Sequence, residues 1–97
     1  MSRPVINRID QMQALLAEYL PTHIDIVDDS HKHAGHEGAR SGGGHYTLYI
    51  VSTRFAGKST LARHRMIYST LGEMMKRDIH ALNITAYTPE ELESQVH

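Results

Sequence analysis

The histidines of this chain are numerous and closely spaced enough to bind a metal. The sequence has eight histidines and no cysteine. Residues 28–45 read DDSHKHAGHEGARSGGGH and hold four of the eight histidines. Neutral imidazole binds transition metals, and the glycines around His31, His33 and His36 leave those side chains no packing reason to be histidine. The segment is therefore a candidate metal site, with a solvated loop as the alternative.

His64 stands in the tripeptide RHR, in a stretch with helical periodicity. It lies three residues after Leu61 and three before Ile67, so we expect it on the apolar side of a helix. Arg63 and Arg65 are then displaced by about 100° to either side of it. A half-buried histidine with a hydrogen-bond partner is the structural interpretation, and we favour it over a functional role.

His80 opens a stretch that is predicted to be a strand, IHALNITAY. The two-residue period of a strand would place it on the same face as Leu82 and Ile84. From its position alone, His80 would be interpreted as a structural histidine at the edge of a sheet.

Basic residues are concentrated between positions 54 and 77. This stretch has six basic residues and one acidic residue, Glu73, although the net charge of the chain is −1. Such a cluster is a candidate nucleic-acid surface, because cationic side chains contact phosphates; a solvated helix face is the alternative. The six are Arg54, Lys58, Arg63, Arg65, Lys76 and Arg77.

Several short motifs do not support a known chemistry. GKST at residues 57–60 lacks the second glycine of a phosphate-binding loop, because Ser52 stands where it is required. HEGAR lacks the second histidine of a zinc protease motif, since position 40 is Arg40. The glycines 42–44 could donate amides to an anion, but we favour a hairpin connector. No nucleophile, base and orienting group stand together, so we expect no enzyme.

The hydrophobic pattern predicts the elements that position these residues. An amphipathic helix is expected over residues 4–20 and ends at Pro21, and strands are expected over 23–29, 45–52 and 79–87. A helix capped by Ser59 or Thr60 is expected to reach residue 77 or 78. Thr88, Pro89 and Glu91 begin a last helix as N-cap, first helical residue and capping-box partner. The apolar side of the 60–78 helix comprises Leu61, Ile67, Tyr68, Leu71, Met74 and Met75.

The order α-β-β-α-β-α indicates an α/β domain of the α+β kind. We expect residues 1–97 to form a single domain, with a three-stranded sheet that carries helices on one face and a flexible loop over residues 31–44. The first two strands are expected to be antiparallel. No apolar run reaches the roughly 20 residues needed to cross a bilayer, and no signal peptide is visible, so a cytoplasmic location is expected.

Several of these segments together resemble the BolA family. They are DDSHKHAGH, HYTLYIVSTRFAGKSTLARHRMIYSTL and IHALNITAYTPEE, in the family's order and with matching gaps. The resemblance extends from about Ile6 to Glu91. It implies a fold similar to the type II KH domain but without the Gly-x-x-Gly nucleic-acid loop.

The resemblance implies two functions. Bacterial members are described as DNA-binding regulators of morphology, stress response and biofilm formation. Family members also partner monothiol glutaredoxins and share a 2Fe–2S cluster, held by a glutaredoxin cysteine, glutathione and histidines of the BolA protein. The isolated chain is then expected to carry no cofactor and to be a monomer or a weak homodimer.

The resemblance also assigns cluster ligands. His80 matches the family's C-terminal ligand histidine, and His33 best matches the ligand from the loop between the first two strands. His31 and His36 are close alternates, whereas His64 matches a family histidine that is not our first choice as a ligand. A chain without cysteine needs a partner for the thiolates, and imidazole can replace thiolate on one iron. Because histidine must be neutral to bind, such a site is sensitive to acid.

Overall fold

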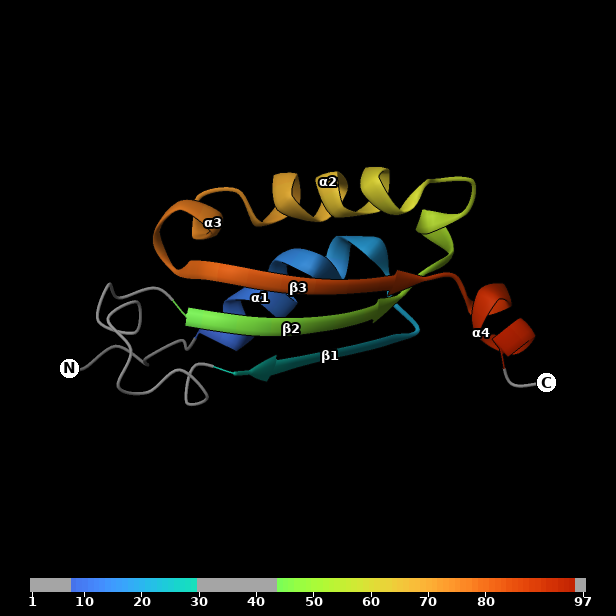
Figure 1. Ribbon diagram of the computed structural model, residues 1–97, viewed down its shortest axis with the longest axis horizontal. Helices are drawn as coiled ribbons and strands as arrows, with labels where there is room; N and C mark the ends of the chain where they lie inside the picture. Colours follow the sequence, from blue (N-terminus) through green and yellow to red (C-terminus); the bar gives the residue numbers. More distant parts are fainter. Residues whose placement is uncertain (1–7, 30–43, 96–97) are drawn as a thin grey trace.

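A computed structural model describes residues 8–29 and 44–95. Its elements follow the predicted order (Figure 1). They are α1 (Arg8–Leu16), the 3-10 turn η1 (Ala17–Tyr19), β1 (His23–Asp28), β2 (Gly44–Val51), the 3-10 turn η4 (Thr53–Phe55), α2 (Thr60–Leu71), α3 (Met74–Arg77), β3 (Ile79–Tyr87) and α4 (Pro89–Gln95).

The three strands form one sheet in the order β1-β2-β3. β1 pairs antiparallel with β2, as predicted, and Ile26 stands opposite Leu48. β3 pairs parallel with β2, and Ile84 stands opposite the same Leu48. A parallel pair needs a crossover connection, which α2 and α3 supply.

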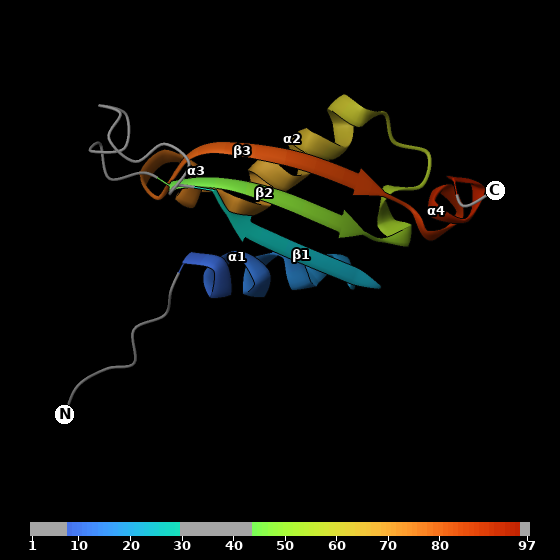
Figure 2. The ribbon, with the colours of Figure 1, turned by 60° about the horizontal axis from the view of Figure 1, so that its bottom comes forward.

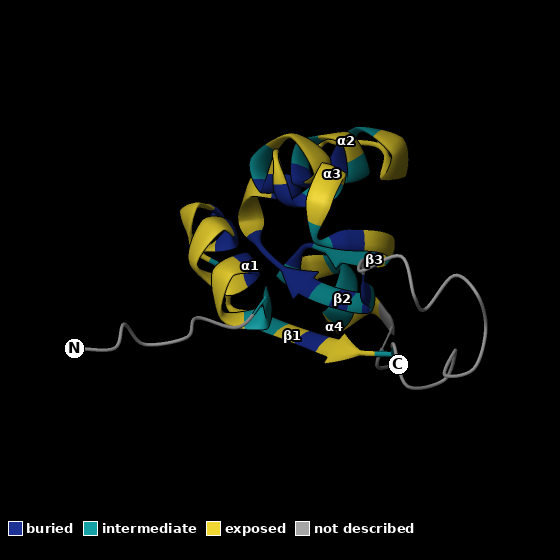
Figure 3. Ribbon diagram, turned by 90° about the vertical axis from the view of Figure 1, so that its left-hand side faces the viewer, coloured by how far each residue is buried: buried dark blue, intermediate teal, exposed yellow. Residues whose placement is uncertain are grey.

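Helices α1, α2 and α3 lie on one side of the sheet (Figures 2 and 3). On β2, Tyr46, Leu48 and Ile50 point into the core beneath these helices. The intervening residues Thr47 and Tyr49 therefore point to the opposite face, which we call the open face. α4 follows at the end of β3, beyond the sheet (Figure 1). The predicted three-stranded sheet with helices on one face is confirmed.

The predicted helix over residues 60–78 is divided in two. α2 ends at Leu71, and Gly72 adopts φ +52° and ψ −116°, a conformation that L side chains rarely adopt. The Gly72 N–H still donates to the Tyr68 carbonyl oxygen over 3.0 Å, after which the chain turns into α3. The prediction was wrong here because one glycine in a periodic apolar pattern does not disclose its backbone angles.

The core face of α2 also differs from the prediction. Arg63, Ile67 and Leu71 are buried, at one-turn spacing, and Met74 of α3 is buried with them. Leu61 and Tyr68 were predicted to join this side, but they are 59% and 41% exposed. Polar contacts of Arg63, described below, hold this arginine against the C-terminal end of β3 and thereby set the rotation of the helix.

Both predicted helix starts have side-chain caps. Ser59 is the N-cap of α2, and its hydroxyl accepts a hydrogen bond from the Ala62 N–H at 3.1 Å. At α4, the Glu91 carboxylate accepts from the Thr88 N–H at 2.8 Å, and the Glu91 N–H donates to the Thr88 hydroxyl at 3.2 Å. The predicted capping box is confirmed. Across the described ranges, no helix is long and apolar enough to span a membrane.

Candidate metal site and basic surface

His80 lies in a β-bulge at the start of β3. Gly44 pairs with Ile79 and the next residue, His45, pairs with Ala81, so His80 is an extra residue that has no partner position on β2. A bulge shifts the alternation of side chains. Ile79 is buried in the core, whereas His80 is exposed. The expectation that His80 shares a face with Leu82 and Ile84 is wrong for this reason.

His45 is the neighbour of His80 that sequence reasoning did not single out. It precedes the core residue Tyr46 on β2, so its side chain belongs to the open face. The ring centroids of His45 and His80 are 5.0 Å apart, and the ring planes differ by 38°. Two nitrogens bound to one tetrahedral metal at about 2.1 Å lie about 3.4 Å apart, a separation that rings at this distance can reach. The two imidazoles therefore form a candidate ligand pair.

Gly44 belongs to the sheet and not to the loop that was predicted to include it. It is buried, and a Cβ added there would lie 2.6 Å from the ring of Tyr46. The last glycine of the GGG run is thus required by close packing beside His45. Gly42 and Gly43, which were predicted to belong to a hairpin connector, lie outside the described residues.

The predicted loop ligands His31, His33 and His36 also lie outside the described residues. The described residues at the ends of their segment show where that segment leaves and re-enters the sheet. The Asp29 N–H donates to the His45 carbonyl oxygen at 2.7 Å, so the chain leaves β1 directly beside His45. The Thr47 hydroxyl donates to the Asp29 carboxylate at the same end of the sheet. The segment that carries these histidines therefore starts and ends at the His45–His80 pair.

The pair cannot complete a metal site from the described part of the chain. No group of three or more His, Asp or Glu residues that could hold a metal occurs within residues 8–29 and 44–95. His64 does not join the pair, because it is half-buried on α2 in the helix layer. The arrangement offers one or two imidazoles to a transition metal whose remaining ligands would come from elsewhere.

Five of the six basic residues predicted to form a nucleic-acid surface are exposed. Arg54 lies in η4, Arg65 is on α2, and α3 carries the last two of the group. Lys76 also forms a 3.6 Å ion pair with Glu73. The exposed group, which we call the basic surface, comprises Arg54, Lys58, Arg65, Lys76 and Arg77.

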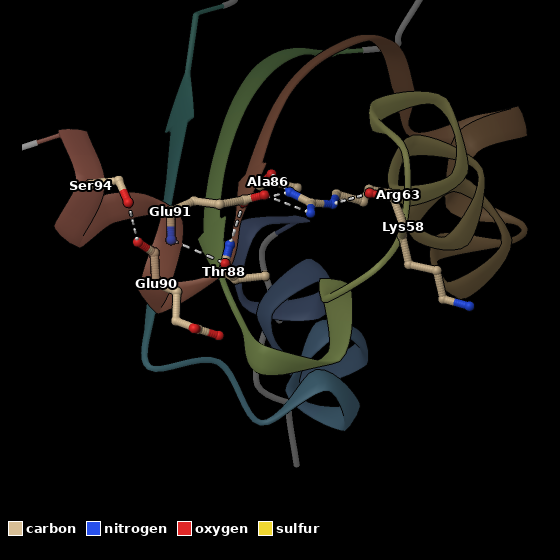
Figure 4. Close-up of polar contacts among 7 residues, drawn as sticks. All are labelled: Lys58, Arg63, Ala86, Thr88, Glu90, Glu91 and Ser94. Carbon is tan, nitrogen blue, oxygen red and sulfur yellow. Dashed lines mark hydrogen bonds and ion pairs between the residues drawn. The ribbon is translucent and has the colours of Figure 1, made fainter.

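Arg63 does not belong to the basic surface, which corrects its assignment from sequence. It is 7% exposed, and its guanidinium forms two parallel hydrogen bonds with the Glu91 carboxylate at 2.7 and 2.9 Å (Figure 4). Its Nε donates to the Lys58 carbonyl oxygen at 3.0 Å, and one terminal nitrogen donates to the Ala86 carbonyl oxygen at 2.9 Å. These contacts join the start of α2, the end of β3 and α4, and they leave the guanidinium committed to structure.

The partner of Arg63 is strongly acidic. The hydrogen bonds from Arg63, followed by that from the Thr88 N–H, lower the pKa of Glu91 to about 2. The same pair raises the pKa of Arg63 above its ordinary value, against the effect of burial. Glu91 is therefore ionised throughout the neutral and mildly acidic range, and the link between α2 and α4 persists with it.

The fold and this site describe a small α+β domain with an imidazole pair at one end of an open sheet face. Residues 15–91 match the family model described as BolA-like protein. The chain belongs to the BolA family, as its motifs predicted.

Relatives of this chain are named as a DNA-binding regulator and as a SufE-like protein. The chain is 41% identical over 81 residues to the DNA-binding transcriptional regulator BolA of Escherichia coli, covering 84% of this chain and 74% of that protein. It is 41% identical over 85 residues to SufE-like protein 1, chloroplastic/mitochondrial, of Arabidopsis thaliana, covering 82% of this chain but 23% of that protein. The solved structure of BolA1 from Arabidopsis thaliana superposes with a TM-score of 0.77 at 35% identity, covering 91% of this chain and 98% of that one. A relative named as chloroplastic/mitochondrial leaves the expected cytoplasmic location unconfirmed.

Proposed function

We propose that this protein partners a monothiol glutaredoxin and shares a 2Fe–2S cluster with it, in iron–sulfur trafficking or sensing. The observation that carries the proposal is the pair of imidazole rings 5.0 Å apart on the open face. His80 is the principal ligand, and either His45 or His33 is the second.

The donor set supports this choice of cofactor. A chain without cysteine cannot hold a cluster through its own thiolates. Imidazole on one iron raises the reduction potential of the cluster, so a shared site would differ chemically from one ligated by thiolate alone. Thiolate and glutathione from the partner would complete the coordination. Because imidazole must be neutral to bind, the cluster should dissociate from this chain as the histidines become protonated.

Titration with a cluster-loaded monothiol glutaredoxin tests the proposal. We expect the visible circular dichroism of the cluster to change on mixing, and the change to be lost in His80→Ala. Comparing His45→Ala with His33→Ala assigns the second ligand, since the variant that removes a ligand alters the spectrum. His64→Ala is the matched control and should behave as the wild type. A spectrum that does not respond to the wild-type chain, or that responds equally to His80→Ala, would contradict the proposal.

DNA binding is the second function that we propose, because a relative of 41% identity is named as a DNA-binding transcriptional regulator and the basic surface is exposed. Contacts with phosphates release counterions, so the affinity for promoter DNA should fall with salt with a log–log slope of about −0.9 per phosphate. Arg65→Gln should reduce this slope by roughly one. Absence of binding at low salt, or an unchanged slope, would exclude the basic surface.

A further inference from the structure

The open face of the sheet carries a row of aromatic rings at the end opposite His80. His23 of β1, Tyr49 of β2 and Tyr87 of β3 span all three strands. The ring centroids of His23 and Tyr49 are 5.5 Å apart, and those of Tyr49 and Tyr87 are 6.1 Å apart, both edge-to-face. Neither tyrosine is buried, although the core side of the same strands is fully packed. The row is therefore not needed to fill the core.

The surface between this aromatic row and the histidine pair is partly open to solvent, and Thr47 and Thr85 are half-buried within it. Ala81 and Asn83 of β3 are exposed, as is Asp25 of β1, which stands directly opposite Tyr49. The described helices α1, α2 and α3 lie on the other side of the sheet (Figure 3). The open face thus forms one surface that runs from His80 to Tyr87.

The position of the histidine pair decides from which side a cluster partner approaches. The ring of His80 is exposed and lies beside that of His45 on the open face, so a metal held by the pair lies on that side of the sheet. Metal–ligand bonds are about 2.0–2.3 Å long, and the protein that supplies the thiolates must therefore contact the same face. A partner that approached from the helix layer would be separated from the cluster by the sheet.

The contact between this chain and its partner must extend along the strands, because a specific interface is larger than the histidine pair. A stable protein–protein interface buries more than about 1,000 Å² in total, which two histidines cannot supply. Tyr49 follows His45 by four residues, a distance of about 13 Å along β2, within the radius of such an interface. Tyrosine is enriched among the residues that dominate binding energy. We propose that the thiolate-bearing partner docks on the open face, where Tyr49 and Tyr87 of this chain are the anchor residues. This inference rests on the proposed function.

The charge of the open face indicates the charge of the partner surface that contacts it. The described residues of the open face include the exposed carboxylate of Asp25 and no lysine or arginine, whereas the basic surface lies on η4, α2, α3 and the turn before α2. The surface that contacts Asp25 and Tyr49 is therefore neutral or basic. An arginine or lysine near the partner's thiolate fits this surface, since it would approach both the carboxylate and the tyrosine ring.

Calorimetric titration with the cluster-loaded monothiol glutaredoxin tests this docking. The double variant Tyr49→Ser/Tyr87→Ser should bind about tenfold or more weakly, because truncated anchor residues typically cost that much. At saturating partner concentration it should still give the wild-type visible circular dichroism, since the histidines are unchanged. Leu61→Ser/Tyr68→Ser removes apolar groups that are more exposed than the two tyrosines, from α2 on the other side of the sheet. It is the control and should bind as the wild type does.

Asp25→Lys provides a second variant that leaves the packing of the sheet intact. It should weaken binding, and the loss should diminish at high salt as the added repulsion is screened. Wild-type affinity in both open-face variants, or loss of affinity in the α2 control alone, would overturn the docking proposal while the cluster spectrum upheld the proposed function. A wild-type chain that neither binds nor alters the spectrum would overturn both.

Discussion

Arg63 and His80 each lie against a residue that is distant in the sequence, Glu91 and His45 respectively. Charge and helical spacing placed Arg63 with the other basic residues, and nothing in RHR distinguishes a buried arginine from an exposed one. Its role depends on Glu91, which is 28 positions later in the chain. Family resemblance predicted His80 as a ligand, and that role stays a prediction. Its neighbour His45 became visible only through a β-bulge that sequence alone does not reveal.

The buried guanidinium of Arg63 should contribute measurably to stability. Arg63→Met should lower the free energy of unfolding by about 2–4 kcal/mol, because the carbonyl oxygens of Lys58 and Ala86 lose their donor. Arg65→Met, one residue away and exposed, should change it by less than about 0.5 kcal/mol. Urea unfolding of both variants measures the difference. Equal effects of the two substitutions would show that Arg63 is not the link described here.

Among the elements, the helix caps and the strands were predicted better than the core face and the end of α2. The capping box at Thr88, the Ser59 cap and the three strands were all predicted correctly, because each depends on residues close together in sequence. The rotation of α2 and its separation from α3 were not. The former depends on a tertiary ion pair, and the latter on the backbone angles of Gly72.

Gly72→Ala tests the junction between α2 and α3. A side chain at φ +52° and ψ −116° is strained, so the substitution should destabilise the protein by about 1–3 kcal/mol. Space is not the obstacle, since the nearest atom to an added Cβ is the Ser69 carbonyl oxygen at 3.7 Å. Thermal unfolding measures the change, and Ser69→Ala, at an exposed position of α2, is the control. A stabilised Gly72→Ala variant would show that one continuous helix is accessible.

For the whole molecule, the pair of Arg63 and Glu91 predicts a specific response to acid. The pKa of Glu91 is lowered to about 2, so the ionised carboxylate stabilises the folded state fully above the ordinary carboxyl pKa of 4.5. This contribution should decline as the pH falls from about 4.5 toward 2. The difference in unfolding free energy between wild type and Glu91→Gln should therefore be constant near neutrality and shrink across that window. A difference that is independent of pH would contradict the assigned shift.

The molecule as a whole separates two kinds of surface. The basic surface accompanies the helices and the turns that lead into them, and the histidine pair and aromatic row lie on the open face of the sheet. This separation could not be predicted from the sequence, because the bulge and the rotation of α2 decide which side chains reach each surface. It allows both proposed functions to exist in one chain of 97 residues.

The proposed function requires an imidazole of this chain to ligate a cluster whose thiolates come from another protein. Pulsed electron paramagnetic resonance of the reduced complex tests it directly, with ¹⁵N-histidine incorporated in this chain alone and the glutaredoxin unlabelled. We predict strong ¹⁵N hyperfine coupling to the cluster, lost in His80→Ala and retained in His64→Ala. A complex that holds a reduced 2Fe–2S cluster without ¹⁵N coupling would show that the partner ligates it entirely, and would contradict the proposed function.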